Sequence, residues 1–218
     1  MKRVVKRWLA GWVAGSVAAL SLVGAALAEP ADEHNVGLKS YAGGDVVGAM
    51  QQLRAPAKAG YAPSQVLLAF ILMSADLSEE AVGYYRSAAA QDHPEGHAGL
   101  AAAYQVGRGI AKDEKLALQH FSKAADLGHP KSIEIMADVY MSGALGVGTA
   151  PPAEVLAMVR RAADKVSHLP AIDALAEAYT SGRWGLTPDA QQAAQWKARG
   201  AEVRKQRAGT PPPRRGSR

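Results

Sequence analysis

Apolar residues recur along this chain at the spacing of amphipathic α-helices, and one helical pattern returns three times. Each copy ends in a tyrosine, at Tyr104, Tyr140 and Tyr179, and these tyrosines are 36 and 39 residues apart. A degenerate earlier copy ends at Leu72, which lies 32 residues before Tyr104. Periods of this size are typical of stacked helix pairs, in which each pair buries its apolar face against its neighbours. The pattern therefore predicts an all-α, right-handed α-solenoid.

The clearest repeat shows how each helix pair is built. The spacing predicts a first helix over about 95–106, which ends at the glycine-containing stretch 107–109. Asp113 then offers an N-cap carboxylate to a second helix, and Pro130 suits the first turn of the helix that follows. Extended along the chain, this arrangement predicts five antiparallel helix pairs, or ten helices, between about residues 31 and 205.

This repeat resembles the Sel1-like repeat, a longer-looped relative of the tetratricopeptide repeat. The matching residues are Ala98, Leu100, Ala101, Tyr104, Gly107, Gly109, Ile110, Asp113, Leu116, Ala117, Phe121, Lys123, Ala124, Ala125 and Gly128. The resemblance is strongest over 97–128, good over 133–165 and fair over 171–201, whereas 36–60 and 63–92 are more similar to tetratricopeptide repeats. It implies a scaffold that recruits other proteins and needs no cofactor. The first helix of each pair would line the concave surface, with a protein or peptide partner laid along it.

Residues 1–28 have the pattern of an export signal. A basic start is followed by an uncharged stretch from Trp8 to Ala28, and Ala26-Leu27-Ala28 has the form of a cleavage site. We expect cleavage after Ala28 and a periplasmic or secreted protein. The alternative is an uncleaved inner-membrane anchor, because 21 uncharged residues are just enough to span a bilayer. The chain has no cysteine, which excludes disulfides and a lipid-modified N-terminus.

The net charge of +5 is unevenly distributed. The predicted signal carries four basic residues and no acidic one, residues 204–218 carry six basic residues, and 29–202 carry 15 basic against 20 acidic residues. The body is therefore mildly acidic, which argues against a nucleic-acid partner. We expect four segments: a signal peptide at 1–28, tetratricopeptide-like or degenerate Sel1-like repeats at 29–95, Sel1-like repeats at 96–203, and a basic, proline-rich, disordered tail at 204–218.

Patterns that suggest metal binding or catalysis have structural explanations here. His93 and His97 have the i, i+4 spacing of a helical metal pair, but a proline and a glycine lie between them. His93 also matches His129 and His168 at the same point of successive repeats, which predicts turn residues. The glycine loops lack the strand and the Gly-Lys-Ser/Thr of a phosphate-binding loop, and acidic pairs such as Glu79-Glu80 suit a first helical turn. We predict no catalytic residue, metal or cofactor.

Two loops offer candidate partner-binding residues. Arg183-Trp184 lies between glycines, and Arg and Trp are the residue types that dominate binding hot spots. The alternative is that Trp184 folds back over the last helix pair. Arg108 occupies a comparable loop. The predicted function is a non-catalytic protein–protein interaction scaffold in the bacterial cell envelope. The alternatives are an envelope hydrolase or cell-wall-fragment-binding protein, and a protein that holds an anionic membrane or cell-wall polymer through its basic tail.

Overall fold

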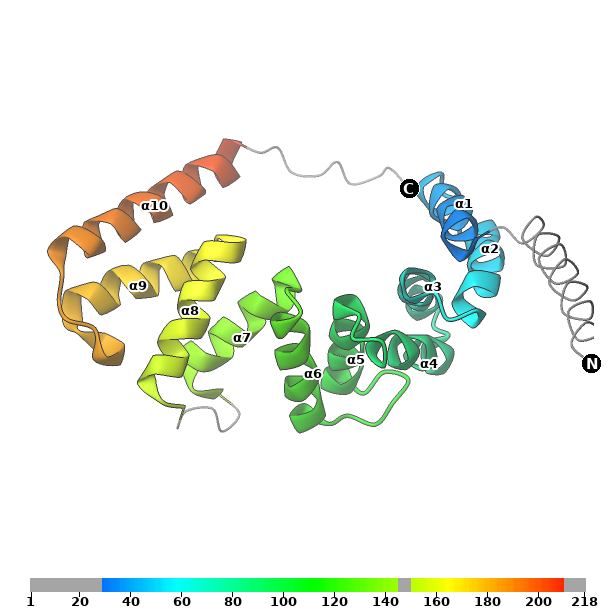
Figure 1. Cartoon of the computed structure of the whole chain (residues 1–218), viewed down its shortest axis with the longest axis horizontal. Helices are drawn as coiled ribbons and strands as arrows, with labels where there is room; N and C mark the ends of the chain where they lie inside the picture. Colours follow the sequence, from blue (N-terminus) through cyan, green and yellow to red (C-terminus); the bar gives the residue numbers. More distant parts are fainter. Residues whose placement is uncertain (1–28, 145–149, 210–218) are drawn as a thin grey trace, which may run out of the picture.

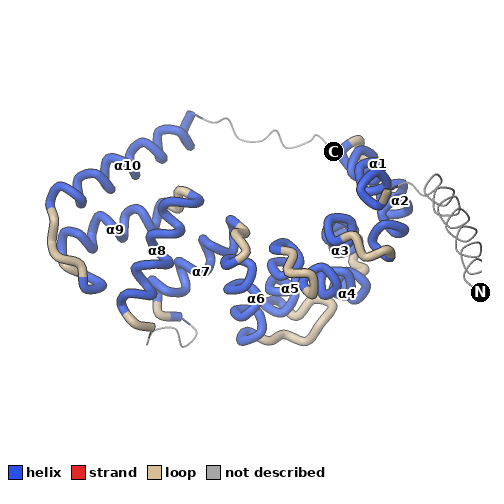
Figure 2. The backbone as a smooth tube through the Cα atoms, in the orientation of Figure 1, coloured by secondary structure: helices blue, strands red, loops and turns tan. Residues whose placement is uncertain are grey.

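A computed structural model describes residues 29–144 and 150–209, and within them it contains ten α-helices, one short 3-10 helix and no strand (Figures 1 and 2). The helices are α1 (Pro30–Ala42), α2 (Val46–Lys58), α3 (Ala62–Ser74), α4 (Ser78–Ala89), α5 (Pro94–Val106), α6 (Glu114–Asp126), α7 (Pro130–Ser142), α8 (Pro152–Val166), α9 (Leu169–Ser181), η2 (Arg183–Gly185) and α10 (Ala190–Gly209). The predicted all-α solenoid of ten helices is confirmed. The predicted signal at 1–28 and the end of the predicted tail lie outside the described residues.

Consecutive helices pack as hairpins, and the hairpins follow one another along an arch (Figure 1). The pair α1–α2 lies at one end and α9–α10 lies at the other. The odd-numbered helices also touch one another, α1 with α3, α3 with α5 and α7 with α9. They therefore form one row along the arch, and the even-numbered helices form a second.

The hydrophobic core has two clusters that meet in α5. One cluster holds Leu53, Leu68 and other side chains of α2 to α5. The other extends from α5 to α10. Leu100 of α5 belongs to the first cluster and its neighbour Ala101 belongs to the second. Each repeat therefore buries its apolar face against the next one, as expected for a solenoid.

Cationic side chains clamp successive even-numbered helices together. Arg161 and Arg199 each donate to a backbone carbonyl 36 residues earlier, near the end of the preceding even-numbered helix. Each also pairs with the aspartate that follows that carbonyl. The equivalent ion pair one repeat earlier uses a lysine. The three pairs are Lys123–Asp92 (2.9 Å), Arg161–Asp126 (3.2 Å) and Arg199–Asp164 (2.7 Å).

Most helix starts lie where the sequence predicts them. Asp113 caps α6 by accepting a hydrogen bond from the Leu116 N–H at 2.9 Å. The three histidines at matching points of the repeats, His93, His129 and His168, are the N-cap residues of α5, α7 and α9, which confirms them as turn residues.

The last helix differs from the sequence expectation at both ends. The sequence pattern suggests Thr187-Pro188 as its cap, but the structure shows Asp189 in this role, with its Oδ1 accepting from the Gln191 and Gln192 N–H groups at 2.9 and 3.0 Å. The helix then continues to Gly209, six residues past the predicted repeat boundary. Its last turns are held because Arg204 pairs with Asp173 and Arg207 donates to the Ser167 carbonyl at 3.2 Å.

Candidate protein-binding groove

An open groove of about 570 Å³ runs across the row of odd-numbered helices. Residues of α1, α3 and α5 line it, together with Tyr85 of α4 and the cap residue His129 before α7. These helices belong to the row of odd-numbered helices, which we call the inner row. Because they follow one another along it, the groove crosses several repeats. A partner segment laid in it would contact more than one helix pair.

The floor of the groove is apolar and accessible. Leu38 of α1 and Phe70 of α3 line it and are 44% and 50% exposed. Tyr41 meets the Phe70 ring edge-on at 6.3 Å between centroids. Gly99 leaves room for the buried Tyr85, because a Cβ on Gly99 would lie 2.4 Å from the tyrosine ring. Exposed aromatic and aliphatic side chains grouped in a groove are the usual sign of an interaction surface.

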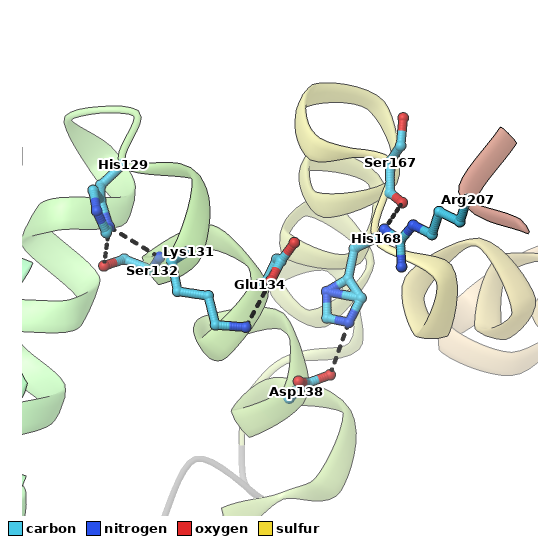
Figure 3. A network of polar contacts seen from close by, with 8 residues as sticks. All are labelled: His129, Lys131, Ser132, Glu134, Asp138, Ser167, His168 and Arg207. Atoms are coloured by element: carbon cyan, nitrogen blue, oxygen red, sulfur yellow. Dashed lines mark hydrogen bonds and ion pairs between the residues drawn. The ribbon is translucent and has the colours of Figure 1, made fainter. Parts of the chain in front are cut away.

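Polar groups on the rim have partners within the protein. The Nδ1 atom of His34 lies 3.0 Å from Ser64 Oγ, and burial lowers the pKa of His34, so this imidazole is neutral at pH 7. His129 Nδ1 lies 2.8 Å from Ser132 Oγ and accepts from the Ser132 N–H at 3.2 Å (Figure 3). Glu95 is half exposed and lies 3.1 Å from His93 Nδ1.

Beyond the groove, the odd-numbered helices α7 and α9 carry acidic side chains. Glu134 pairs with Lys131 of the same helix at 2.9 Å, and Asp138 lies 3.4 Å from His168 Nε2 (Figure 3). Glu177 is exposed on α9. The two parts of the row therefore differ in chemistry, with an apolar part over α1 and α3 and an acidic part over α7 and α9.

Arg108, a predicted partner-binding residue, lies outside the groove in the loop between α5 and α6. Its Nη2 donates to the Met73 carbonyl at 2.8 Å and pairs with Asp76, and its Nε donates to Ser78 Oγ at 3.1 Å. The guanidinium therefore ties this loop to the turn between α3 and α4. It retains 44% side-chain exposure.

Arg183 and Trp184 lie in η2, between α9 and α10, at a different repeat from Arg108. Trp184 is half buried against the second core cluster, and its segment contacts α8 and α9. The Arg183 guanidinium lies 4.6 Å from the Trp184 ring centroid, a cation–π distance. Trp184 has a φ of 59°, which a non-glycine residue rarely adopts. The structure does not bring Arg108 and Arg183-Trp184 into one site.

The sequence did not predict Leu38 and Phe70. The only available signal was an aromatic residue two positions after Leu68, where the matching residues of later repeats are small or acidic. Helical periodicity separates buried from exposed positions, but it does not show which exposed positions border a shared groove.

A second unpredicted feature is the contact between His97 of α5 and His120 of α6, whose Nδ1 atoms are 2.9 Å apart. Burial lowers the pKa of His97, although nearby Asp92 opposes this, and burial together with His97 lowers the pKa of His120. Tyr104 stacks on His120 with 5.7 Å between centroids.

Among the described residues, no group of three His, Asp or Glu side chains is placed to hold a metal ion. Within the same residues, no helix is long and apolar enough to cross a membrane.

This arrangement of stacked helix hairpins with a groove across several of them defines an α-solenoid of the protein-binding repeat class. A family model described as the Sel1 repeat matches residues 72–93, 94–129 and 170–202. These matches correspond to the end of α3 with α4, to α5–α6 and to α9–α10. The chain therefore contains Sel1 repeats. The matches at 94–129 and 170–202 lie where the sequence predicts such repeats, whereas the match at 72–93 lies in the stretch 63–92 that was expected to be more similar to tetratricopeptide repeats.

Similar proteins and structures agree with this assignment. A crystal structure of a Sel1 repeat protein from Oxalobacter formigenes has a TM-score of 0.63 and 24% identity, and the match covers 80% of this chain and 73% of that chain. A protective antigen of uropathogenic Escherichia coli with an SLR fold has a TM-score of 0.50 and 23% identity, over 80% of this chain and 46% of the other. At these identities the likeness shows the fold.

An uncharacterized protein of Neisseria meningitidis serogroup B is 34% identical over 110 residues. The match covers 50% of this chain and 23% of the length of that protein. Sel1 repeat folds generally serve as scaffolds for protein–protein interaction, and the apolar groove is the feature of this chain suited to that role.

Proposed function

We propose that this chain is a non-catalytic adaptor of the bacterial cell envelope, which binds a segment of a partner protein along its odd-numbered helices. The observation that carries this proposal is the groove of about 570 Å³ across α1, α3 and α5. Its accessible Leu38 and Phe70 give a partner apolar area to bury, and burial of such area drives most protein association.

The placement in the envelope rests on the sequence of residues 1–28. A basic start, an uncharged stretch and a small-residue cleavage site are the features of an export signal. N-terminal sequencing of the protein from the periplasmic fraction should find Glu29 as its first residue. A protein that stays in the membrane fraction with residues 1–28 attached would instead support the anchor.

Photo-crosslinking in intact cells tests the adaptor role. A photoreactive amino acid at Phe70 places the probe in the groove, and one at Gln119, an exposed residue of α6, provides a matched control on the other row of helices. We expect a defined protein adduct from position 70 that is absent from position 119. Identical adducts from both positions, or none from position 70, would contradict the proposal.

A further inference from the structure

The surface side chains of the inner row of helices change from apolar to acidic along the row, at matching positions of successive repeats. Helices α3, α5, α7 and α9 align on a buried residue in each, namely Leu68, Leu100, Met136 and Leu175. Two positions after the buried residue, the exposed side chains are Phe70, Ala102, Asp138 and Glu177. Two positions before it, the accessible side chains are Val66, Ala98, Glu134 and Asp173. At both of these aligned positions, the residue is therefore apolar on α3, alanine on α5 and acidic on α7 and α9.

The two rows of helices also differ in overall charge. The charged residues of the odd-numbered helices are Asp32, Glu33, Glu95, Glu134, Asp138, Asp173 and Glu177 against Lys39 and Lys131, seven acidic and two basic, a net of −5. Those of the even-numbered helices are Arg54, Lys58, Arg86, Lys115, Lys123, Arg160, Arg161, Lys165, Lys197, Arg199, Arg204, Lys205 and Arg207 against Glu79, Glu80, Glu114, Asp126, Glu154, Asp164 and Glu202, 13 basic and seven acidic, a net of +6. A ligand that approaches the odd-numbered row therefore meets a negative field.

We infer that the segment bound along the odd-numbered helices is a basic peptide with one aromatic or aliphatic anchor. The anchor occupies the groove at Leu38 and Phe70, and Lys or Arg side chains of the segment lie against Asp138 and Glu177. This inference rests on the proposed function and specifies the chemistry of the partner.

The side chains of Asp138 and Glu177 are accessible to the basic side chains of a partner. Among the ion pairs of the described residues, Glu177 takes part in none. Asp138 is 58% exposed at its side chain, and its ion-pair neighbour is the ring of His168 rather than a lysine or arginine. An acidic segment would meet like charge here, which costs affinity and slows association. The same field disfavours nucleic acid.

The geometry also fixes a spacing for the segment. Packed helices lie about 8–10 Å apart, and α3 contacts α5 directly, so two steps along the row from α3 to α7 span at least about 20 Å. An extended chain rises about 3.3 Å per residue, so about six residues separate the anchor from the first basic side chain.

Fluorescence anisotropy with synthetic peptides tests this inference on the chain from residue 29 onwards. The probe has a Phe and, about six positions later, two Lys residues. One comparison peptide carries Glu in place of both Lys residues, and another carries Ser in place of Phe. We expect the Phe–Lys peptide to bind about tenfold more tightly than either, with affinity that weakens as salt is added.

Matched variants assign the effect to the two parts of the surface. Phe70→Ser should weaken binding of the Phe–Lys peptide about tenfold, as the Ser-for-Phe peptide does, because it removes most of the anchor site. Asp138→Asn combined with Glu177→Gln should weaken it about fivefold and reduce its salt dependence, whereas Glu154→Gln on α8 should leave it unchanged. All four residues are exposed, so circular dichroism of each variant should match the parent.

Some results would overturn this inference alone, and others would overturn the adaptor role as well. Equal binding of the Glu peptide, salt-independent binding, or no binding of any peptide would refute the basic segment. Tighter binding of a peptide of residues 210–218 would make the chain's own basic tail the occupant, and concentration-dependent dimerisation through the groove would make it a second copy. Either result would also refute a foreign segment. A protein adduct at Phe70 whose crosslinked segment is not basic would retain the adaptor and reject this inference.

Discussion

Helices α3 and α9 of the inner row have the same interior and different surfaces. In α3 and α9 the aligned core residues Leu68 and Leu175 are both fully buried, yet the exposed positions two residues further on are Phe70 and Glu177. The repeat therefore constrains the residues that stack hairpins and leaves the inner surface free to vary. Function in such a protein depends on the positions that the repeat does not constrain.

The largest effects should come from the shared interior. Leu68→Ala and Leu175→Ala should each lower the free energy of unfolding by about 2–5 kcal/mol, because both remove a fully buried side chain. Phe70→Ala and Glu177→Ala should each cost less than about 1 kcal/mol, because both side chains are exposed. Urea unfolding monitored by circular dichroism gives all four values. A large loss for either exposed position would show that the surface is part of the packing.

Smaller effects should come from the clamps between even-numbered helices. Arg199→Met should cost about 1–2 kcal/mol, because it removes a hydrogen bond to the Ala163 carbonyl and an ion pair with Asp164. Lys123→Met should cost less than about 1 kcal/mol, because Lys123 makes only a surface ion pair with Asp92. The same unfolding assay compares the two variants. Equal losses would mean that the carbonyl contact contributes nothing.

The smallest effect should be a pH dependence at the junction of the two core clusters. The pKa values of His97 and His120 are lowered in the folded chain, so the unfolded chain binds protons that the folded chain does not. Stability from this pair is therefore complete above about pH 6.5, the ordinary histidine pKa, and is lost as the pH falls below it.

His120→Gln should flatten the profile of stability against pH between about pH 7 and 5. Asp92 and Lys123 also face the pair, so their charges set part of the profile. His34 leaves a residual slope, since burial lowers its pKa too. Thermal unfolding across this range provides the comparison, and a variant as acid-sensitive as the parent would exclude the pair as the cause.

The sequence predicted those features that depend on local chain chemistry. Glycine ends α5, Asp113 caps α6 and histidines precede α5, α7 and α9, as the repeating pattern indicates. It did not predict the surface, because Arg108 and Trp184 are engaged by partners distant in the chain or by the core. Phe70 is accessible because no described helix packs over it. Helical periodicity does not show whether another helix packs over a given position.

The clamp at Arg161 and Arg199 has a consequence for how this chain can change in length. Each arginine reaches a carbonyl 36 residues earlier, so α8 makes this contact with α6 through Arg161 and receives the same contact from Arg199 of α10. Loss of one whole helix pair would still place an arginine next to the equivalent carbonyl of an earlier helix. Loss of a single helix of a pair would leave the guanidinium without this carbonyl. Evolution can therefore lengthen or shorten the inner surface in whole units, and the stretch of partner it accommodates changes in matching steps.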